Sequence, residues 1–194
     1  MGPAPLFKKD AAMPLAKHPE VIKLHETISR PAGPELADKI AYGRTLPLGA
    51  TLEEKSVWVG FVCGALEEAL PEADIIRIRM GCHCDENGKL DEQKRWLREI
   101  YLSSSGLEDF VGKMNELGAG WWIEGNEIYT TYHDCSCPML AGLERLESKT
   151  WCYCTVGYGH TTFEYVFDGP VKAKLVESIK LGSERCVIKI SRAV

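Results

Sequence analysis

The feature that most constrains this chain is one spacing that occurs three times, in which two cysteines flank a single residue. The pairs are Cys82 with Cys84, Cys135 with Cys137, and Cys152 with Cys154. In extended backbone, residues i and i+2 point to the same side and lie roughly 6.5 to 7 Å apart, whereas in a helix they diverge by about 200°. A pair that binds one centre therefore requires a strand end or a loop, and the repetition predicts that the pairs act together.

The second pair has a local sequence that favours such a setting. Pro138 disfavours the helical conformation for the preceding Cys137. Cys135 follows a predicted strand that ends near His133, so His133, Cys135 and Cys137 are expected to share one face.

The third pair alternates with aromatic residues. Trp151 and Tyr153 flank Cys152 and precede Cys154, which in extended backbone places the rings opposite the sulfurs. Thr155 is then the expected cap of the following helix. A sulfur beside a helix N-terminus has a lowered pKa, which favours the thiolate that binds metal or attacks an electrophile.

These pairs predict a metal centre. Thiolate sets suit zinc or an iron–sulfur cluster, and both cofactors stay open. Zinc ribbons use the more relaxed C-x-x-C spacing, while a cluster with several irons tolerates C-x-C. The predicted site is a four-sulfur centre formed by Cys135, Cys137, Cys152 and Cys154. The first pair, Cys82 and Cys84, completes or adjoins this centre.

The two remaining cysteines are predicted to be small buried hydrophobes. Cys63 lies on an apolar predicted helix, and Cys186 alternates with Ile188 and Ile190. His160, on the same side of a predicted helix as two phenylalanines, is expected to be a core histidine.

Composition narrows the function classes. The 194 residues are 45% hydrophobic, which predicts a single domain over residues 18–194 after a Pro-rich flexible arm at 1–17. A net charge of -5 without a basic stripe argues against a nucleic-acid partner.

No apolar run approaches the roughly 18 to 20 residues of a membrane span. Without a signal-peptide pattern, we expect a cytoplasmic protein, whose thiols stay reduced.

Apolar periodicity predicts an α+β fold, with a helical N-terminal half packed on a four-stranded, mainly antiparallel sheet. Helices are expected over residues 18–29, 35–42, 52–70, 73–80, 91–102, 107–117 and about 155–167. Strands are expected over 121–123, 127–133, 171–179 and 186–190. A Gly125-Asn126 turn joins the first two strands as a hairpin.

Three functions remain open. The leading hypothesis is a metal-binding sensor or accessory protein that binds a small molecule. The second is a thiol-dependent hydrolase of a small amide, in which Cys152 or Cys135 attacks with His133 or His160 as base. The third is a dithiol redox protein, and structural disulfides are a further reading because the cysteine count is even.

The predicted hairpin is rich in aromatic residues. They are candidates for the wall of a ligand pocket, for a homodimer face or for plain core packing. The residues concerned are Trp121, Trp122, Tyr129 and Tyr132.

Residues 151–190 read WCYCTVGYGHTTFEYVFDGPVKAKLVESIKLGSERCVIKI. This segment resembles the closing helix-strand-strand unit of 4-vinyl-reductase-like domains. It is also similar to the L-2-amino-thiazoline-4-carboxylate hydrolase-like family and to uncharacterised prokaryotic Cys-rich proteins. The resemblance implies a small-molecule-binding α+β fold with a metal near the cysteines, or hydrolysis of a thiazoline-like substrate. Ser178 stands where the vinyl-reductase-like pattern has a cysteine, four residues before Gly182. A zinc site that pairs such a cysteine with Cys186 is therefore not expected.

Overall fold

The computed structural model describes residues 18–83 and 89–192. The predicted arm at 1–17 and Cys84 lie outside these ranges. The helices are α1 (Pro19–Ala32), α2 (Pro34–Ala41), α3 (Leu52–Ala69), α4 (Glu72–Met80), α5 (Leu90–Leu102), α6 (Leu107–Glu116) and α7 (Tyr153–Phe167). The strands are β1 (Trp122–Glu124), β2 (Glu127–Tyr132), β3 (Val171–Glu177) and β4 (Cys186–Arg192). Short 3-10 helices precede α7 (η2, Thr150–Cys152) and β4 (η3, Ile179–Leu181).

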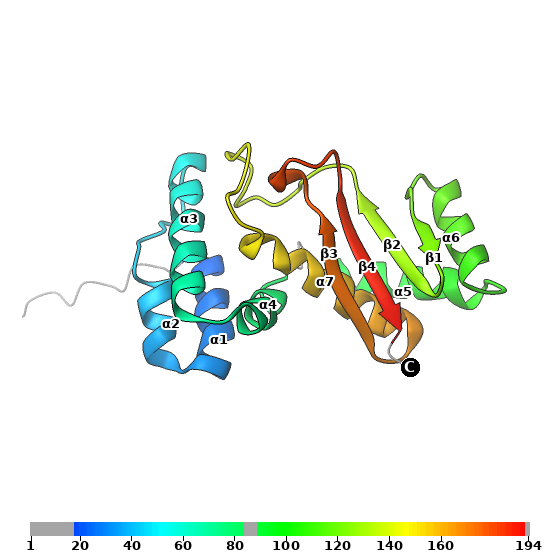
Figure 1. Ribbon diagram of the computed structural model, residues 1–194, viewed down its shortest axis with the longest axis horizontal. Coiled ribbons are helices and arrows are strands. Elements are labelled where there is room, and N and C mark those ends of the chain that lie inside the picture. The colour runs from blue at the N-terminus through cyan, green and yellow to red at the C-terminus, as the bar shows by residue number, and fades with distance from the viewer. Residues whose placement is uncertain (1–17, 84–88, 193–194) are drawn as a thin grey trace, which may run out of the picture.

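The strands form one antiparallel sheet in the order β1-β2-β4-β3 (Figure 1). Ile190 of β4 pairs with Ile128 of β2 on one side and with Ala173 of β3 on the other. Both isoleucines are buried, because this face of the sheet is covered by a helix. The predicted α+β class with a four-stranded antiparallel sheet is confirmed.

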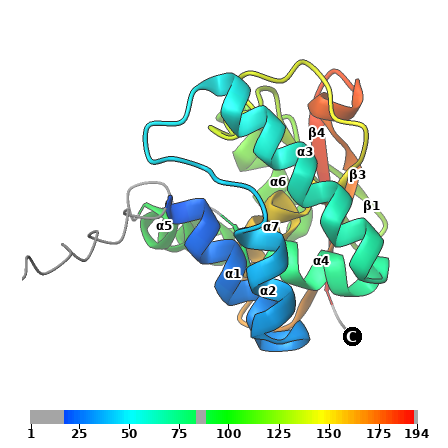
Figure 2. The same ribbon diagram turned by 90° about the vertical axis from the view of Figure 1, so that its left-hand side faces the viewer.

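Helix α7 covers that inner face, and α5 packs beside it (Figure 1). The first four helices form a group of their own next to the sheet, and Figure 2 shows them in front of the strands. This group reaches the sheet layer mainly through α4, which crosses α7. None of the helices within residues 18–83 and 89–192 combines the length and the apolar character that a bilayer crossing needs.

Helix α3 fixes the start of α7 through two contacts. Trp58 of α3 and Trp151 of η2 are both fully buried and meet edge to face, with ring centroids 5.7 Å apart. The hydroxyl of Thr150 donates to the carboxylate of Glu67 at 2.5 Å. The capping box of Thr51 and Glu54 sets where α3 begins. These interactions place η2, and with it Cys152, at a defined position.

The crossing of α4 and α7 depends on a glycine. A side chain at Gly157 of α7 would overlap the backbone of Met80, the last residue of α4. The two helices can therefore approach this closely only because Gly157 has no Cβ.

We predict that Gly157→Ala destabilises the protein by roughly 3 kcal/mol, because backbone atoms of Met80 must move to admit the methyl group. Gly64→Ala in α3 is the matched control, since an added Cβ there meets nothing within 4 Å. The control should gain up to about 1 kcal/mol from helix propensity. Urea unfolding of both variants measures the difference, and equal stabilities would contradict the tight crossing.

Candidate functional site

A cavity of about 400 Å³ lies beside the end of the sheet where β2 finishes and β4 starts. Four of its lining residues are cysteines contributed by three separate parts of the chain: Cys135, Cys137, Cys154 and Cys186. The rest of the lining is mostly polar or aromatic: Lys89, Leu90, Gln93, Tyr132, Asp134, Ser136, Pro138, Thr155 and Tyr158. Four of the seven described cysteines thus line one space.

The second C-x-C pair follows β2 directly. The strand ends at Tyr132, and Cys135 to Cys137 lie in a segment with neither helix nor strand. Both cysteines line the cavity, and the carbonyl of Cys137 accepts the N–H of Leu140 at 3.0 Å. The predicted loop setting for this pair is confirmed.

The third pair has a different backbone from the one predicted. Cys152 is the last residue of η2 and Cys154 lies in the first turn of α7, so this stretch is helical and not extended. The two side chains therefore diverge. Cys154 lines the cavity, whereas Cys152 is buried, with its Sγ 3.4 Å from the Ser178 Oγ. The change accompanies a long-range contact, because the residue that η2 carries into the core is Trp151, which packs edge to face on Trp58 of α3.

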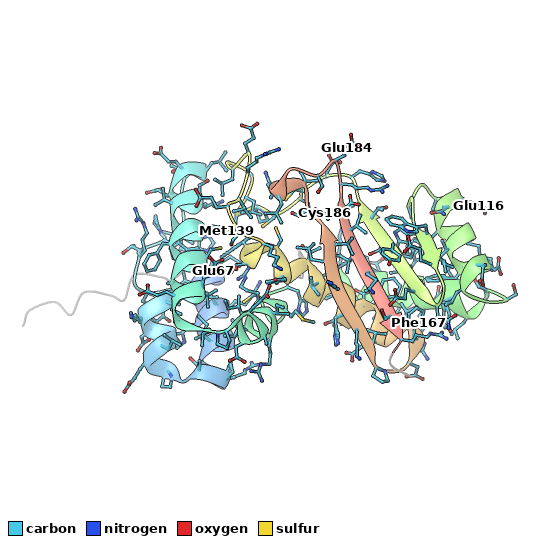
Figure 3. All side chains as sticks on the ribbon, in the orientation of Figure 1. Glu67, Glu116, Met139, Phe167, Glu184 and Cys186 are labelled. Atoms are coloured by element: carbon cyan, nitrogen blue, oxygen red, sulfur yellow. The ribbon has the colours of Figure 1, made fainter. Side chains whose placement is uncertain are left out.

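Cys186 belongs to the cavity although its sequence pattern predicts a buried hydrophobe. It is the first residue of β4, pairs in register with Tyr132, and accepts the N–H of Ile179 on its Sγ at 3.4 Å. Figure 3 shows it at the upper end of the sheet. The inner face of β4, apolar at Ile188 and Ile190, opens into the cavity at this residue. The sequence did carry one signal for this placement, because Cys186 is the first residue of the predicted strand.

The first pair is not brought to the cavity within the described residues. Cys82 is fully buried, with its Sγ 3.0 Å from the Thr27 Oγ1 of α1 and 3.5 Å from the Ile78 carbonyl. It is not a lining residue, and its partner Cys84 lies outside the described ranges. Cys63 is buried in the core, as predicted.

The described lining of the cavity contains no histidine. The ring of His133 lies against Gly120, and His133 is not among the lining residues, whereas Cys135 and Cys137 are. His160 is partly exposed, and its Nδ1 lies 3.4 Å from a carboxylate oxygen of Glu164. It is therefore not the core histidine expected from the sequence.

The aromatic residues of the hairpin lie in three different settings. Trp121 packs on Phe110 and Phe163, with ring centroids 5.9 and 5.7 Å away. Trp122 stacks on Tyr129, and Tyr132 lines the cavity.

Burial keeps several thiols protonated. It raises the pKa of Cys152 to about 11 and raises the pKa of Cys137 as well. A protonated thiol is a poor nucleophile, while a metal can displace the proton. Across residues 18–83 and 89–192, no three His, Cys, Asp or Glu side chains are placed to hold one metal ion. The sulfurs line the cavity without meeting at one point.

A buried arginine lies behind the third pair. Arg79 of α4 is 1% exposed, donates through Nη2 to the Trp151 carbonyl at 3.1 Å, and stacks on the Trp151 ring with its Cζ 3.8 Å from the centroid. Burial alone lowers the pKa of Arg79, but the negative charges of Cys82, Cys154, Cys63 and Glu20, when ionised, raise it above its ordinary value. Since arginine is always charged in proteins, a cation is present beside this cysteine group.

The match to protein families covers nearly the whole chain. Residues 16–193 match the model of a Family of unknown function (DUF6144), and the chain belongs to that family. Searches of curated proteins and of solved structures returned no match.

We predict that the metal-free protein loses stability as the pH rises from about 9 to about 11. The thiols of Cys63 and Cys152 ionise near 11 when folded, because burial raises their pKa from 9.0. In the unfolded chain they release their protons at lower pH. Over this window the folded state therefore binds more protons than the unfolded state, and a rising pH shifts the equilibrium toward the unfolded state. Each thiol should contribute roughly 2 kcal/mol over the window.

Urea unfolding at a series of pH values, on wild type and Cys63→Ala, measures this effect. The variant should show a shallower decline between pH 9 and 11, because it lacks one of the two thiols. Parallel curves would contradict the raised pKa of Cys63.

Proposed function

We propose that the protein binds a sulfur-ligated metal centre in the cysteine cavity and acts as a sensor or accessory protein. The observation that carries the proposal is that Cys135, Cys137, Cys154 and Cys186 line one cavity although they come from three separate segments. Thiols collected in this way suit zinc or an iron–sulfur cluster. The ligand set differs from the sequence-based one in two ways. Cys186 takes the place of Cys152, and the first pair is left out, because Cys82 does not line the cavity and Cys84 lies outside the described residues.

An iron–sulfur cluster is the occupant we favour. A single zinc ion needs its sulfurs about 2.3 Å from one point, and the described thiols do not meet at a point. A cluster has several irons, each bound to a different cysteine, so it suits sulfurs spread around a cavity of about 400 Å³. The Cys135–Cys137 segment has no helix or strand to hold it rigidly, which allows it to adjust to the cluster.

The polar part of the lining supports a small-molecule ligand next to the centre. Tyr132, Tyr158 and Gln93 line the same cavity, and the Tyr158 hydroxyl donates to the Gln93 amide oxygen at 2.5 Å. Groups of this kind orient a polar ligand in an otherwise apolar site.

The geometry favours this proposal over a thiol-dependent hydrolase. A nucleophilic cysteine needs a base within hydrogen-bond reach, and His133 and His160 are not among the residues that line the cavity. Burial also raises the pKa of Cys152, which keeps this candidate nucleophile protonated.

Anaerobic purification, followed by iron, zinc and acid-labile sulfide analysis, tests the proposal. We expect a coloured protein with iron and sulfide in equal amounts, because the sulfide-to-iron transitions of a cluster absorb visible light. Zinc without sulfide would support the proposed metal site but exclude an iron–sulfur cluster as its occupant. A colourless, metal-free, folded protein would overturn the proposal, and a thiol titre that rises by two after reduction would then indicate a dithiol redox protein.

Single substitutions locate the ligands. Cys186→Ala and Cys135→Ala should each lower the bound metal by more than about tenfold under a chelator, because each removes one lining thiol. Cys63→Ala is the matched control, since its thiol is buried in the core and does not line the cavity. Equal metal loss in all three variants would show that the cavity is not the site.

A further inference from the structure

Arg79 is a buried cation without a carboxylate partner among the described residues. Its side chain is 1% exposed, and two of its nitrogen atoms, Nε and Nη1, have no hydrogen-bond partner within residues 18–83 and 89–192. Only Nη2 is used, in the bond to the Trp151 carbonyl. A buried charge is costly unless it is paired, so the position of Arg79 calls for a negative charge nearby.

The groups around Arg79 that can become negative are mainly cysteines. Burial alone lowers the pKa of Arg79, whereas Cys82, Cys154 and Cys63, in that order, raise it when they are ionised, and Glu20 comes after them. Glu20 is held by Lys23, whose Nζ lies 3.2 Å from the carboxylate. Of the three thiols, Cys154 also lines the cavity.

Other features offset only part of the charge. Arg79 lies in the last turn of α4, where the helix dipole favours a cation, and the ring face of Trp151 adds a cation–π contact. In the cavity itself, the charges of Lys89 and Asp134 are opposite in sign. The guanidinium of Arg79 therefore remains an unbalanced positive charge beside the cysteine cavity.

We infer that Arg79 is the built-in counter-cation of an anionic, thiolate-rich centre in the cysteine cavity. This inference rests on the proposed function and specifies the charge of the occupant. Four thiolates around a zinc ion, or around an oxidised cluster core with two positive charges, leave a net charge of roughly −2. Arg79 acts on the centre from behind, through the segment from Trp151 to Cys154, and does not bind the metal itself. It is a positioning and charge-balancing residue.

Two substitutions of Arg79 separate charge from packing. Arg79→Met keeps much of the length and volume and removes the charge, while Arg79→Lys retains the charge. Arg77→Met is the matched control, because Arg77 lies on the same helix, is largely exposed and pairs with Asp74. Each protein is reconstituted anaerobically with ferrous iron and sulfide, and the rate of cluster loss to a chelator is followed by visible absorbance. The urea unfolding of the metal-free form is measured in parallel.

We expect Arg79→Met to lose its cluster about tenfold faster than wild type, while Arg79→Lys stays within about threefold and Arg77→Met is unchanged. The metal-free Arg79→Met protein should be at least as stable as metal-free wild type, because its uncompensated charge is gone. These opposite effects on the metal-free and loaded forms distinguish charge balance from a merely structural role.

Two results overturn the inference, and they can be told apart. If wild type holds a cluster and Arg79→Met holds it equally well, or if its metal-free form is clearly destabilised, Arg79 is a structural residue and the metal site stands. If wild type holds neither cluster nor zinc, the proposed function fails and the inference fails with it.

Discussion

The close crossing of α4 and α7 is the contact on which the rest of the structure depends. Gly157 lets the backbone of α7 lie directly against Met80, and this joins the N-terminal helices to the layer that covers the sheet (Figure 1). Arg79, the residue before Met80, reaches Trp151 across the same crossing. The start of α7, and with it the third cysteine pair, is therefore positioned by the contact of Gly157 with Met80, between segments more than 70 residues apart in the chain.

The cavity depends on a second long-range pairing, at the end of the sheet. The register of β2 with β4 puts Tyr132 opposite Cys186, and the loop that follows β2 carries Cys135 and Cys137 to the same place. Helix α7, which covers the inner face of the sheet, adds Cys154. The cysteine spacing alone cannot produce this arrangement, because the three contributing segments meet only when the sheet and α7 are assembled.

These dependences explain which predictions succeeded. The hairpin and the two C-terminal strands were predictable because alternation, β-branched residues and the Gly125-Asn126 turn are local signals. The start of α7 was not, because the pattern around Trp151 alternates like a strand, while in the structure Trp151 lies in a 3-10 turn and packs on Trp58, a partner distant in the sequence. Cys186 was wrongly predicted to be a buried hydrophobe, because the apolar residues near it indicate only a strand with one buried face. The register with β2 is what places the start of this strand at a cavity. Arg79 carried no local signal, since an arginine in the last turn of a helix is usually exposed.

We predict a metal centre whose protein ligands are all cysteine sulfurs. X-ray absorption spectroscopy at the metal edge of the anaerobically purified protein measures the first coordination shell directly. We expect a shell of sulfur only, with a second shell of metal neighbours at short distance, as in a cluster. A first shell of oxygen and nitrogen would contradict the claim that the thiols of Cys135, Cys137, Cys154 and Cys186 form one centre.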